Sequence, residues 1–114
     1  MIIGVIGLGS IAARHRQNLK QIFPNSTVIA APSTIRKVVG SVPHADVVCD
    51  NYEDIASLAA DFAIVASPAP SHCIQASKLI DKHVPCLIEK PLSSTFKDGY
   101  FFKAYQENRK VLKC

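Results

Sequence analysis

The amino-acid sequence predicts an α/β domain built on a doubly wound parallel sheet of about six strands, with helices on both faces. Short apolar runs alternate with segments of helical periodicity along the 114 residues, and no repeat or low-complexity stretch interrupts this order. The first apolar run, residues 1–6, leads directly into a glycine-rich turn. Because strands that alternate with helices need crossover connections, we expect a parallel sheet covered on both faces.

The strands are expected where β-branched and other apolar residues gather between turn-forming residues. These runs cover residues 1–6, 27–31, 47–49, 62–66, 86–89 and 110–114. The segments that separate them predict helices over residues 10–23, 52–58, 71–83 and 95–108. Between the second and third strands the sequence indicates no regular element.

Apolar residues at helical spacing are expected to face the sheet. They are Ile11, Leu19, Ile22 and Phe23 in the first helix, and Ile74, Leu79 and Ile80 in the helix over 71–83. Pro24 ends the first helix. His15 lies on the same predicted face as Ile11, so we expect a satisfied, half-buried histidine there rather than a catalyst.

The turn after the first strand reads Gly7-Leu8-Gly9-Ser10-Ile11-Ala12, the Gly-x-Gly-x-x-Ala pattern of a dinucleotide-binding Rossmann fold. Gly7 can take a tight turn that a side chain would obstruct. Gly9 lets the backbone approach a pyrophosphate closely, and Ala12 is small enough for helix and strand to pack together. The unpaired N–H groups of the first helical turn, around Ser10 and Ile11, favour an anion together with the helix dipole. We therefore predict a dinucleotide site at this turn.

The composition is that of an ordinary globular domain, with 48% hydrophobic and 19% charged residues. The sequence lacks both an apolar run of about 18 residues for a membrane span and the basic region that opens a secretory signal. We therefore expect no membrane partner. The cysteines show no metal-ligand spacing, so we expect no metal site and reduced thiols in the cytoplasm. These cysteines are Cys49, Cys73, Cys86 and Cys114.

The net charge of +4 is distributed unevenly along the chain. No acidic residue precedes Asp46. The basic residues of this first part are Arg14, Arg16, Lys20, Arg36 and Lys37. A basic half beside a glycine-rich turn suits a small polyanionic ligand, although such charges are also found on solvated helix faces. We do not expect nucleic acid as a partner, because the sequence has no basic stripe interleaved with aromatic residues.

Two further motifs are expected at the same edge of the sheet, since ligands bind beyond the carboxyl ends of parallel strands. The fourth strand leads into Ser67-Pro68-Ala69-Pro70-Ser71-His72, and the fifth ends in Glu89-Lys90-Pro91. Together with the glycine turn, these motifs resemble the N-terminal half of the glucose–fructose oxidoreductase / inositol dehydrogenase (Gfo/Idh/MocA) family. That family couples (Thr/Ser)-Pro-x-x-x-His after strand four to Glu-Lys-Pro after strand five, and here the three motifs occur in the same order and spacing.

The resemblance implies hydride transfer between a nicotinamide cofactor and a sugar, cyclitol or related alcohol. It implies that Lys90 is the catalytic residue, because a lysine of lowered pKa can hydrogen-bond the substrate oxygen and relay a proton. Ser67 and Pro68 would bind the cofactor, and Glu89 would position the backbone or Lys90. His72 would contact cofactor or substrate, or else hold the helix terminus.

The end of the second strand departs from the usual NAD pattern. A carboxylate about 20 residues beyond the glycines ordinarily bonds the adenosine ribose, but residues 30–37 contain none. Ser33 and Thr34 offer hydroxyl groups, and Arg36 or Lys37 can meet a 2′-phosphate unless both cations are merely solvated. The expected cofactor is NAD or NADP, with NADP slightly favoured.

Enzymes of this family continue into a second domain that supplies much of the substrate pocket and the dimer interface. We therefore expect residues 1–114 to be a dinucleotide-binding domain without that C-terminal domain, and incomplete as an enzyme. A non-catalytic nucleotide-sensing or interaction module of the same fold is the alternative, and an S-adenosylmethionine methyltransferase is a weaker one. Aromatic residues crowded into the last predicted helix also indicate self-association through an exposed apolar patch. They are Phe96, Tyr100, Phe101, Phe102 and Tyr105.

Overall fold

A parallel sheet forms the centre of the fold in the computed structural model, which describes residues 1–89 and 111–113. Its six strands lie in the order β3-β2-β1-β4-β5-β6, and every neighbouring pair is parallel. The strands are β1 (Ile2–Ile6), β2 (Thr27–Ala31), β3 (Val47–Val48), β4 (Phe62–Val65), β5 (Cys86–Ile88) and β6 (Val111–Lys113). The predicted doubly wound sheet of about six strands is therefore confirmed.

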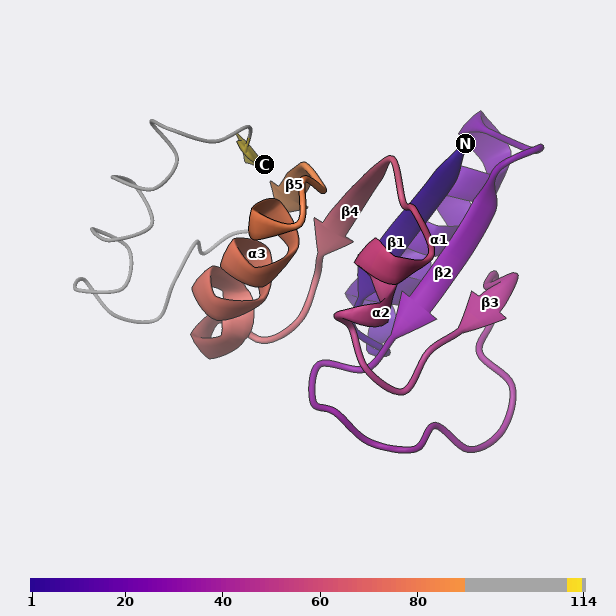
Figure 1. Cartoon of the computed structure of the whole chain (residues 1–114). Helices are drawn as coiled ribbons and strands as arrows, with labels where there is room; N and C mark the ends of the chain where they lie inside the picture. The colour runs from indigo at the N-terminus through magenta and orange to yellow at the C-terminus, as the bar shows by residue number, and fades with distance from the viewer. Residues whose placement is uncertain (90–110, 114) are drawn as a thin grey trace.

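Helices cover both faces of this sheet, with α1 behind it and α2 and α3 in front of it in Figure 1. They are α1 (Ser10–Ile22), α2 (Asp54–Ser57) and α3 (His72–Asp81), the last preceded by a 3-10 turn, η1 (Ala69–Ser71). α1 packs on one face through a cluster that includes Leu19 and Val5. α2 and α3 pack on the other face, where Ile55 and Leu79 belong to a larger cluster. The predicted helix over 95–108 lies outside the described residues.

The strand order reverses at β1, which pairs with β2 on one side and with β4 on the other. Ile6, at the end of β1, lies level with Ala31 of β2 and with Val65 of β4. The carboxyl ends of three strands therefore meet at one edge of the sheet. In a doubly wound fold this is the position at which ligands bind.

The side of α1 that faces the sheet differs from the predicted one. Ala12, Arg16 and Leu19 are buried, whereas Ile11, Ile22 and Phe23 are 59%, 66% and 37% exposed. The prediction for these three apolar residues was wrong because the spacing of apolar residues does not show where a long polar side chain is buried. Such a side chain can take an inward position when its donors find backbone carbonyls.

α3 shows the same effect. Ile74, which was predicted to face inward, is 61% exposed, while His72 and Gln75 are 1% and 2% exposed. Leu79 and Ile80 are buried as predicted. The two polar residues can occupy the sheet-facing side because their side chains are hydrogen-bonded within the protein.

Gly4 makes room for α2 at the middle of the sheet. A Cβ atom at Gly4 would lie 2.4 Å from Cγ2 of Ile55, and Ile55 is fully buried in the cluster beneath α2. The missing side chain therefore allows α2 to pack directly against β1, a requirement that the sequence pattern did not indicate.

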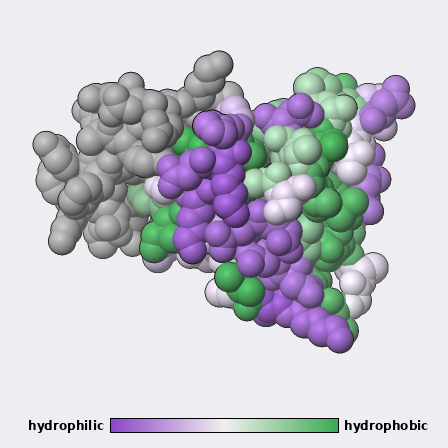
Figure 2. Space-filling view, in the orientation of Figure 1, coloured by the Kyte–Doolittle hydropathy of each residue, from purple (hydrophilic) through white to green (hydrophobic). Residues whose placement is uncertain are grey.

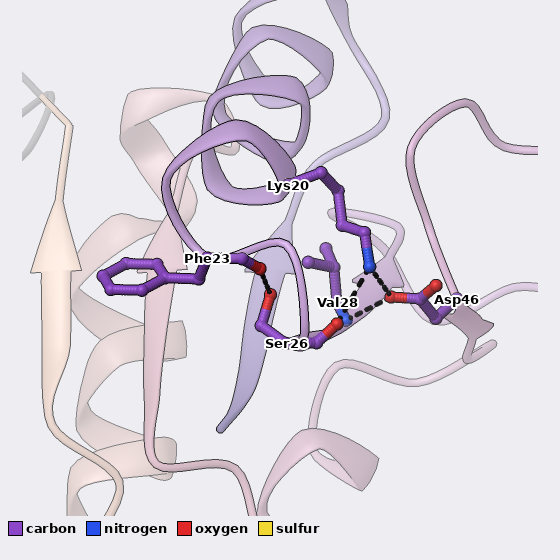
Figure 3. A network of polar contacts seen from close by, with 5 residues as sticks. All are labelled: Lys20, Phe23, Ser26, Val28 and Asp46. Atoms are coloured by element: carbon purple, nitrogen blue, oxygen red, sulfur yellow. Dashed lines mark hydrogen bonds and ion pairs between the residues drawn. The ribbon is translucent and has the colours of Figure 1, made fainter.

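Polar contacts join the end of α1 to the start of β2 and to the residue before β3 (Figure 3). Asp46 Oδ2 accepts hydrogen bonds from the Val28 N–H at 2.8 Å and from Lys20 Nζ at 2.9 Å. Lys20 Nζ also donates to the Ser26 carbonyl at 2.9 Å, and Ser26 Oγ donates to the Phe23 carbonyl at 2.7 Å. The Val28 amide, and then Lys20, lower the pKa of Asp46. We call Lys20, Phe23, Ser26, Val28 and Asp46 the amino-end clip.

The front face of the described part carries both kinds of surface. Figure 2 shows hydrophilic residues gathered over α3 and hydrophobic residues over β2 and the edge strand β3. Within the ranges that the structure describes, no helix is long and apolar enough to cross a membrane.

Candidate functional site

A pocket of about 570 Å³ opens at the carboxyl edge of the sheet, where the strand order reverses. It is lined by Gly7, Leu8, Gly9, Ser10, Ile11, Ser33, Arg36, Ala66, Ser67 and Pro68. These residues follow β1, β2 and β4, so segments far apart in the sequence form one concave surface. Its volume lies within the range of about 300–1,000 Å³ that is typical of small-molecule sites.

Gly7 connects the ends of three strands. Its N–H donates to the Ala31 carbonyl of β2 at 2.8 Å. Its φ of +124° lies in the region that side chains rarely adopt, and a Cβ atom would lie 2.8 Å from the Ala66 carbonyl oxygen after β4. Both conformation and space therefore require glycine here.

Gly9 is open to the pocket and is the N-cap residue immediately before α1. A Cβ atom at this position would meet no atom within 4 Å, and its φ of −79° is available to any residue. No side chain caps the helix, and its first turn contains no acidic residue. Ser10 and Ile11 of this turn line the pocket, whereas Ala12 is buried in the cluster beneath α1. The helix N-terminus thus presents backbone N–H groups and a positive dipole end to the pocket.

Arg16 lies behind the glycine turn and is 1% exposed. Its Nη1 donates to the Gly7 carbonyl at 3.0 Å, and its Nε donates to the Pro43 carbonyl at 2.9 Å. Burial lowers the pKa of its guanidinium. Sequence reasoning counted Arg16 among the basic residues of the first part of the chain, and no sequence signal marked it as buried.

The segment after β2 contributes Ser33 and Arg36 to the pocket. The Arg36 side chain is exposed, while its backbone N–H donates to the Asp50 carbonyl at 3.0 Å. Thr34 and Lys37 are exposed and are not among the lining residues. Of the hydroxyl groups and cations expected around the adenosine ribose, the structure brings Ser33 and Arg36 to the pocket.

Buried polar side chains link the segment after β4 to the segment after β2. Ser67 Oγ donates to Gln75 Oε1, and Gln75 Nε2 donates to the Ser33 carbonyl at 2.7 Å. His72 Nε2 hydrogen-bonds the Ser67 carbonyl. His72 is 1% exposed and is not among the lining residues, so it supports the pocket wall from inside the protein. Sequence reasoning missed Gln75, because nothing in an α3 pattern distinguishes an inward glutamine from a surface one.

The segment after β5 is tied to α1 by His15 and Glu89. His15 Nε2 and Glu89 Oε1 are 2.7 Å apart, with side chains 21% and 27% exposed. The expectation of a satisfied, half-buried His15 is confirmed. Glu89 was expected to position the backbone or Lys90, and His15 was not foreseen as its partner. Lys90 lies outside the described residues.

Among the described residues, Cys49 and Cys86 carry free thiols. Burial raises the pKa of Cys86 to about 12 and also raises the pKa of Cys49. Both thiols therefore stay protonated near neutral pH, which makes them weak nucleophiles and weak metal ligands.

Comparison with known proteins adds a family to this geometry. A family model described as "Oxidoreductase family, NAD-binding Rossmann fold" (GFO_IDH_MocA) matches residues 1–112. The inositol 2-dehydrogenase of Rubrobacter xylanophilus is 28% identical over 96 residues, which make up 82% of this chain and 28% of that protein. The chain thus spans about 28% of the length of this curated relative.

Solved structures share the fold. A Gfo/Idh/MocA family oxidoreductase from Vibrio cholerae aligns with a TM-score of 0.82 at 18% identity, covering 100% of this chain and 38% of that one. The myo-inositol dehydrogenase of Lactobacillus casei, in complex with NAD(H) and myo-inositol, aligns with a TM-score of 0.80 at 17% identity. That alignment covers 99% of this chain and 36% of that one.

Proposed function

This chain belongs to the Gfo/Idh/MocA oxidoreductase family, whose NAD-binding Rossmann domain it matches, and we propose that its pocket binds a nicotinamide dinucleotide. The observation that carries the proposal is the open Gly9 at the uncapped start of α1. A pyrophosphate can approach the backbone there without displacing a side chain. The pocket then continues to Ser33 and Arg36, which are suited to a ribose and its phosphate.

Each wall of the pocket has its own proposed role. The backbone around Gly9, Ser10 and Ile11 binds the pyrophosphate. Ser33 and Arg36, which line the pocket, surround the adenosine ribose. Ser67 and Pro68 bind the nicotinamide half of the cofactor. Three further residues support the pocket from behind: Ala12 beneath the glycine turn, His72 behind the segment after β4 and Glu89 directly after β5.

The cofactor, when bound, supplies the hydride acceptor or donor. We propose that Lys90 hydrogen-bonds the reacting oxygen of the substrate and relays its proton. The proposed substrates are polyols or sugars, because the matched relatives are named as inositol dehydrogenases. This chain spans about 28% of the length of the curated relative. We therefore propose that residues 1–114 bind the cofactor but do not oxidise polyols by themselves. Turnover of a polyol with NAD(P), lost in Lys90→Ala, would contradict this proposal.

We also propose that NADP is preferred over NAD. The support is a pocket wall with Arg36 and no carboxylate in residues 30–37. An arginine that pairs with a 2′-phosphate forms a charge-assisted hydrogen bond worth about 1.5–3 kcal/mol, so Arg36→Gln should weaken NADPH by roughly tenfold or more. NADH binding should hardly change. Lys37→Gln is the matched control, since Lys37 carries the same charge outside the pocket lining. Equal loss of NADPH and NADH in Arg36→Gln would refute the preference.

Cytoplasmic location and self-association are two further proposals. The free thiols of Cys49 and Cys86 fit a reducing compartment. Self-association rests on the aromatic residues between 96 and 105, which lie outside the described residues. Sedimentation velocity over a range of concentrations tests it, and a strictly monomeric chain would contradict it.

The proposed ligand class is tested by calorimetric titration of the full chain with NADPH, NADH and S-adenosylmethionine. We expect both nicotinamide cofactors to bind and S-adenosylmethionine to give no heat. Binding of S-adenosylmethionine alone would replace the oxidoreductase proposal with a methyltransferase.

A further inference from the structure

Arg16 is a buried cation that forms no ion pair with a carboxylate of the described residues. Among the ion pairs of the described residues, in which nitrogen and oxygen lie within 4.0 Å, none includes Arg16. Its described side-chain partners are the carbonyl oxygens of Gly7 and Pro43. Burying a charge is costly unless it is paired or strongly hydrogen-bonded. A guanidinium held by neutral dipoles alone therefore leaves a positive field inside the protein.

That field lies next to the pocket. The Gly7 carbonyl, which accepts from Arg16 Nη1 at 3.0 Å, belongs to a residue that lines the pocket. The α1 N-terminus, which begins at the same turn, adds the positive end of its dipole. Two sources of positive potential therefore converge on the side of the pocket where Gly9 leaves space.

The hydrogen bond from Arg16 also fixes the direction of the Gly7 carbonyl group. Because the Gly7 carbonyl points to the buried guanidinium, its negative end is turned into the protein and away from a ligand in the pocket. The second bond, to Pro43, holds the segment that follows β2 and that carries Ser33 and Arg36. Arg16 thus joins the glycine turn to the adenosine side of the pocket.

We propose that Arg16 is a positioning residue that selects anionic ligands: its buried charge is balanced by the pyrophosphate, through the Gly7 turn and without direct contact. The inference rests on the proposed function and deepens it. It distinguishes Arg16 from Lys20, whose charge is already paired with Asp46 at 2.9 Å, and from Arg14, which is exposed on the same helix.

A charge variant tests the proposal with ligands of different charge. Arg16→Met should weaken NADPH, NADH and inorganic pyrophosphate on the order of tenfold, as loss of a nearby charge at an effective dielectric constant of about 20 predicts. Adenosine, which is uncharged, should bind within about twofold of its wild-type affinity, the scale of an effect outside its own contacts. A mere brace would weaken adenosine and pyrophosphate alike.

Two further variants complete the test. Arg16→Lys keeps the charge but loses the guanidinium geometry, and should hold pyrophosphate within about threefold of wild type. If Arg16→Met does not fold, Arg16→Gln, which removes the charge but keeps hydrogen-bond donors, replaces it in every comparison. Arg14→Gln removes an exposed charge from the same helix and should change pyrophosphate binding by about twofold at most.

The outcomes separate this inference from the proposed function. If the wild-type chain binds neither NAD(P)H nor pyrophosphate, the proposed function fails. If it binds them and a folded Arg16→Met binds pyrophosphate equally well, the role of Arg16 is refuted. Equal loss of adenosine and pyrophosphate in a folded Arg16→Met or Arg16→Gln chain would also refute it. The loss in Arg16→Met should persist when salt is raised, because a buried charge is screened less than a surface one.

Discussion

The two ends of the sheet differ in whether their polar groups have hydrogen-bond partners within the protein. At the amino end, Lys20, Asp46 and Ser26 pair with one another and with the backbone, so the amino-end clip satisfies its own donors and acceptors. At the carboxyl end, α1 starts without a side-chain cap and Gly9 faces open space. The contacts at the amino end therefore stabilise the fold. At the carboxyl end, the N–H groups at the start of α1 have no side-chain cap and remain available to a ligand.

Three of the five basic residues that precede Asp46 lie at these two ends. Lys20 is neutralised by Asp46 at the amino end, whereas Arg16 and Arg36 lie at the carboxyl end, one buried behind the pocket and one lining it. The sequence indicated an excess of positive charge for a polyanion. The structure places one of those charges, Arg36, in the pocket lining and another, Arg16, behind it.

The largest loss of stability is expected from a substitution in the glycine turn at the carboxyl end of the sheet. Gly7→Ala places a Cβ atom 2.8 Å from the Ala66 carbonyl at a φ of +124°. Backbone strain and the steric clash together should lower the free energy of unfolding by about 3 kcal/mol. Urea denaturation measures the loss. Gly9→Ala is the matched control, because its φ of −79° and empty surroundings admit a methyl group. Equal stability of the two variants would contradict the geometry of the turn.

A smaller effect is expected where buried side chains support the pocket walls. Gln75→Leu leaves the Ser67 hydroxyl and the Ser33 carbonyl without the partner they have in the native protein. The free energy of unfolding should fall by about 2 kcal/mol, and NADPH should bind more weakly because both walls lose a shared support. Thermal unfolding and calorimetry measure the two effects. Ile74→Gln, at an exposed position of the same helix, should change either quantity little, and a larger effect there than at Gln75 would overturn the assignment.

The amino-end clip should affect stability alone. Asp46→Ala removes the acceptor of the Val28 N–H and the partner of Lys20, which should lower the free energy of unfolding by about 1 kcal/mol. NADPH affinity should stay unchanged, because the clip lies at the opposite end of the sheet. A change in cofactor affinity would show that the two ends are coupled.

The same residue predicts a pH dependence. The pKa of Asp46 is lowered in the folded protein from the value of 3.8, so its contribution to stability is complete above that value. It is lost as the pH falls through the lower, folded-state value. The stability difference between wild type and Asp46→Ala should therefore shrink in acid. A difference that grows in acid would contradict the assigned direction.

Much of the pocket could be predicted from the sequence because its lining is carried by local motifs. The glycine turn, the strand ends and the helix between them are encoded by neighbouring residues, which is why Gly7, Gly9 and Ser67 were expected at one edge. Ser33 and Arg36 followed from their distance along the chain beyond the glycines. These positions depend on topology, which alternating strand and helix patterns specify.

The supports behind the pocket could not be predicted in this way. Arg16 and Gln75 are buried because their donors meet carbonyl groups of distant segments. Only the folded chain brings those partners together. For the same reason, hydrophobic periodicity wrongly predicted that Ile11 and Ile74 face the sheet, whereas polar residues of the same helices are buried there. Whether a polar side chain is buried depends on partners from distant segments, so hydrophobic periodicity cannot predict it.

We propose the open space at Gly9 as the site of the dinucleotide. Calorimetric titration of NADPH into wild type, Gly9→Ala and Gly9→Val tests it most directly. Because nothing lies within 4 Å of a Cβ atom at Gly9, all three chains should fold alike, while the valine side chain fills the space that a pyrophosphate needs. We predict graded weakening, with Gly9→Val losing on the order of a hundredfold in affinity, about 2.7 kcal/mol. Equal NADPH affinity in folded wild type and Gly9→Val would contradict the account.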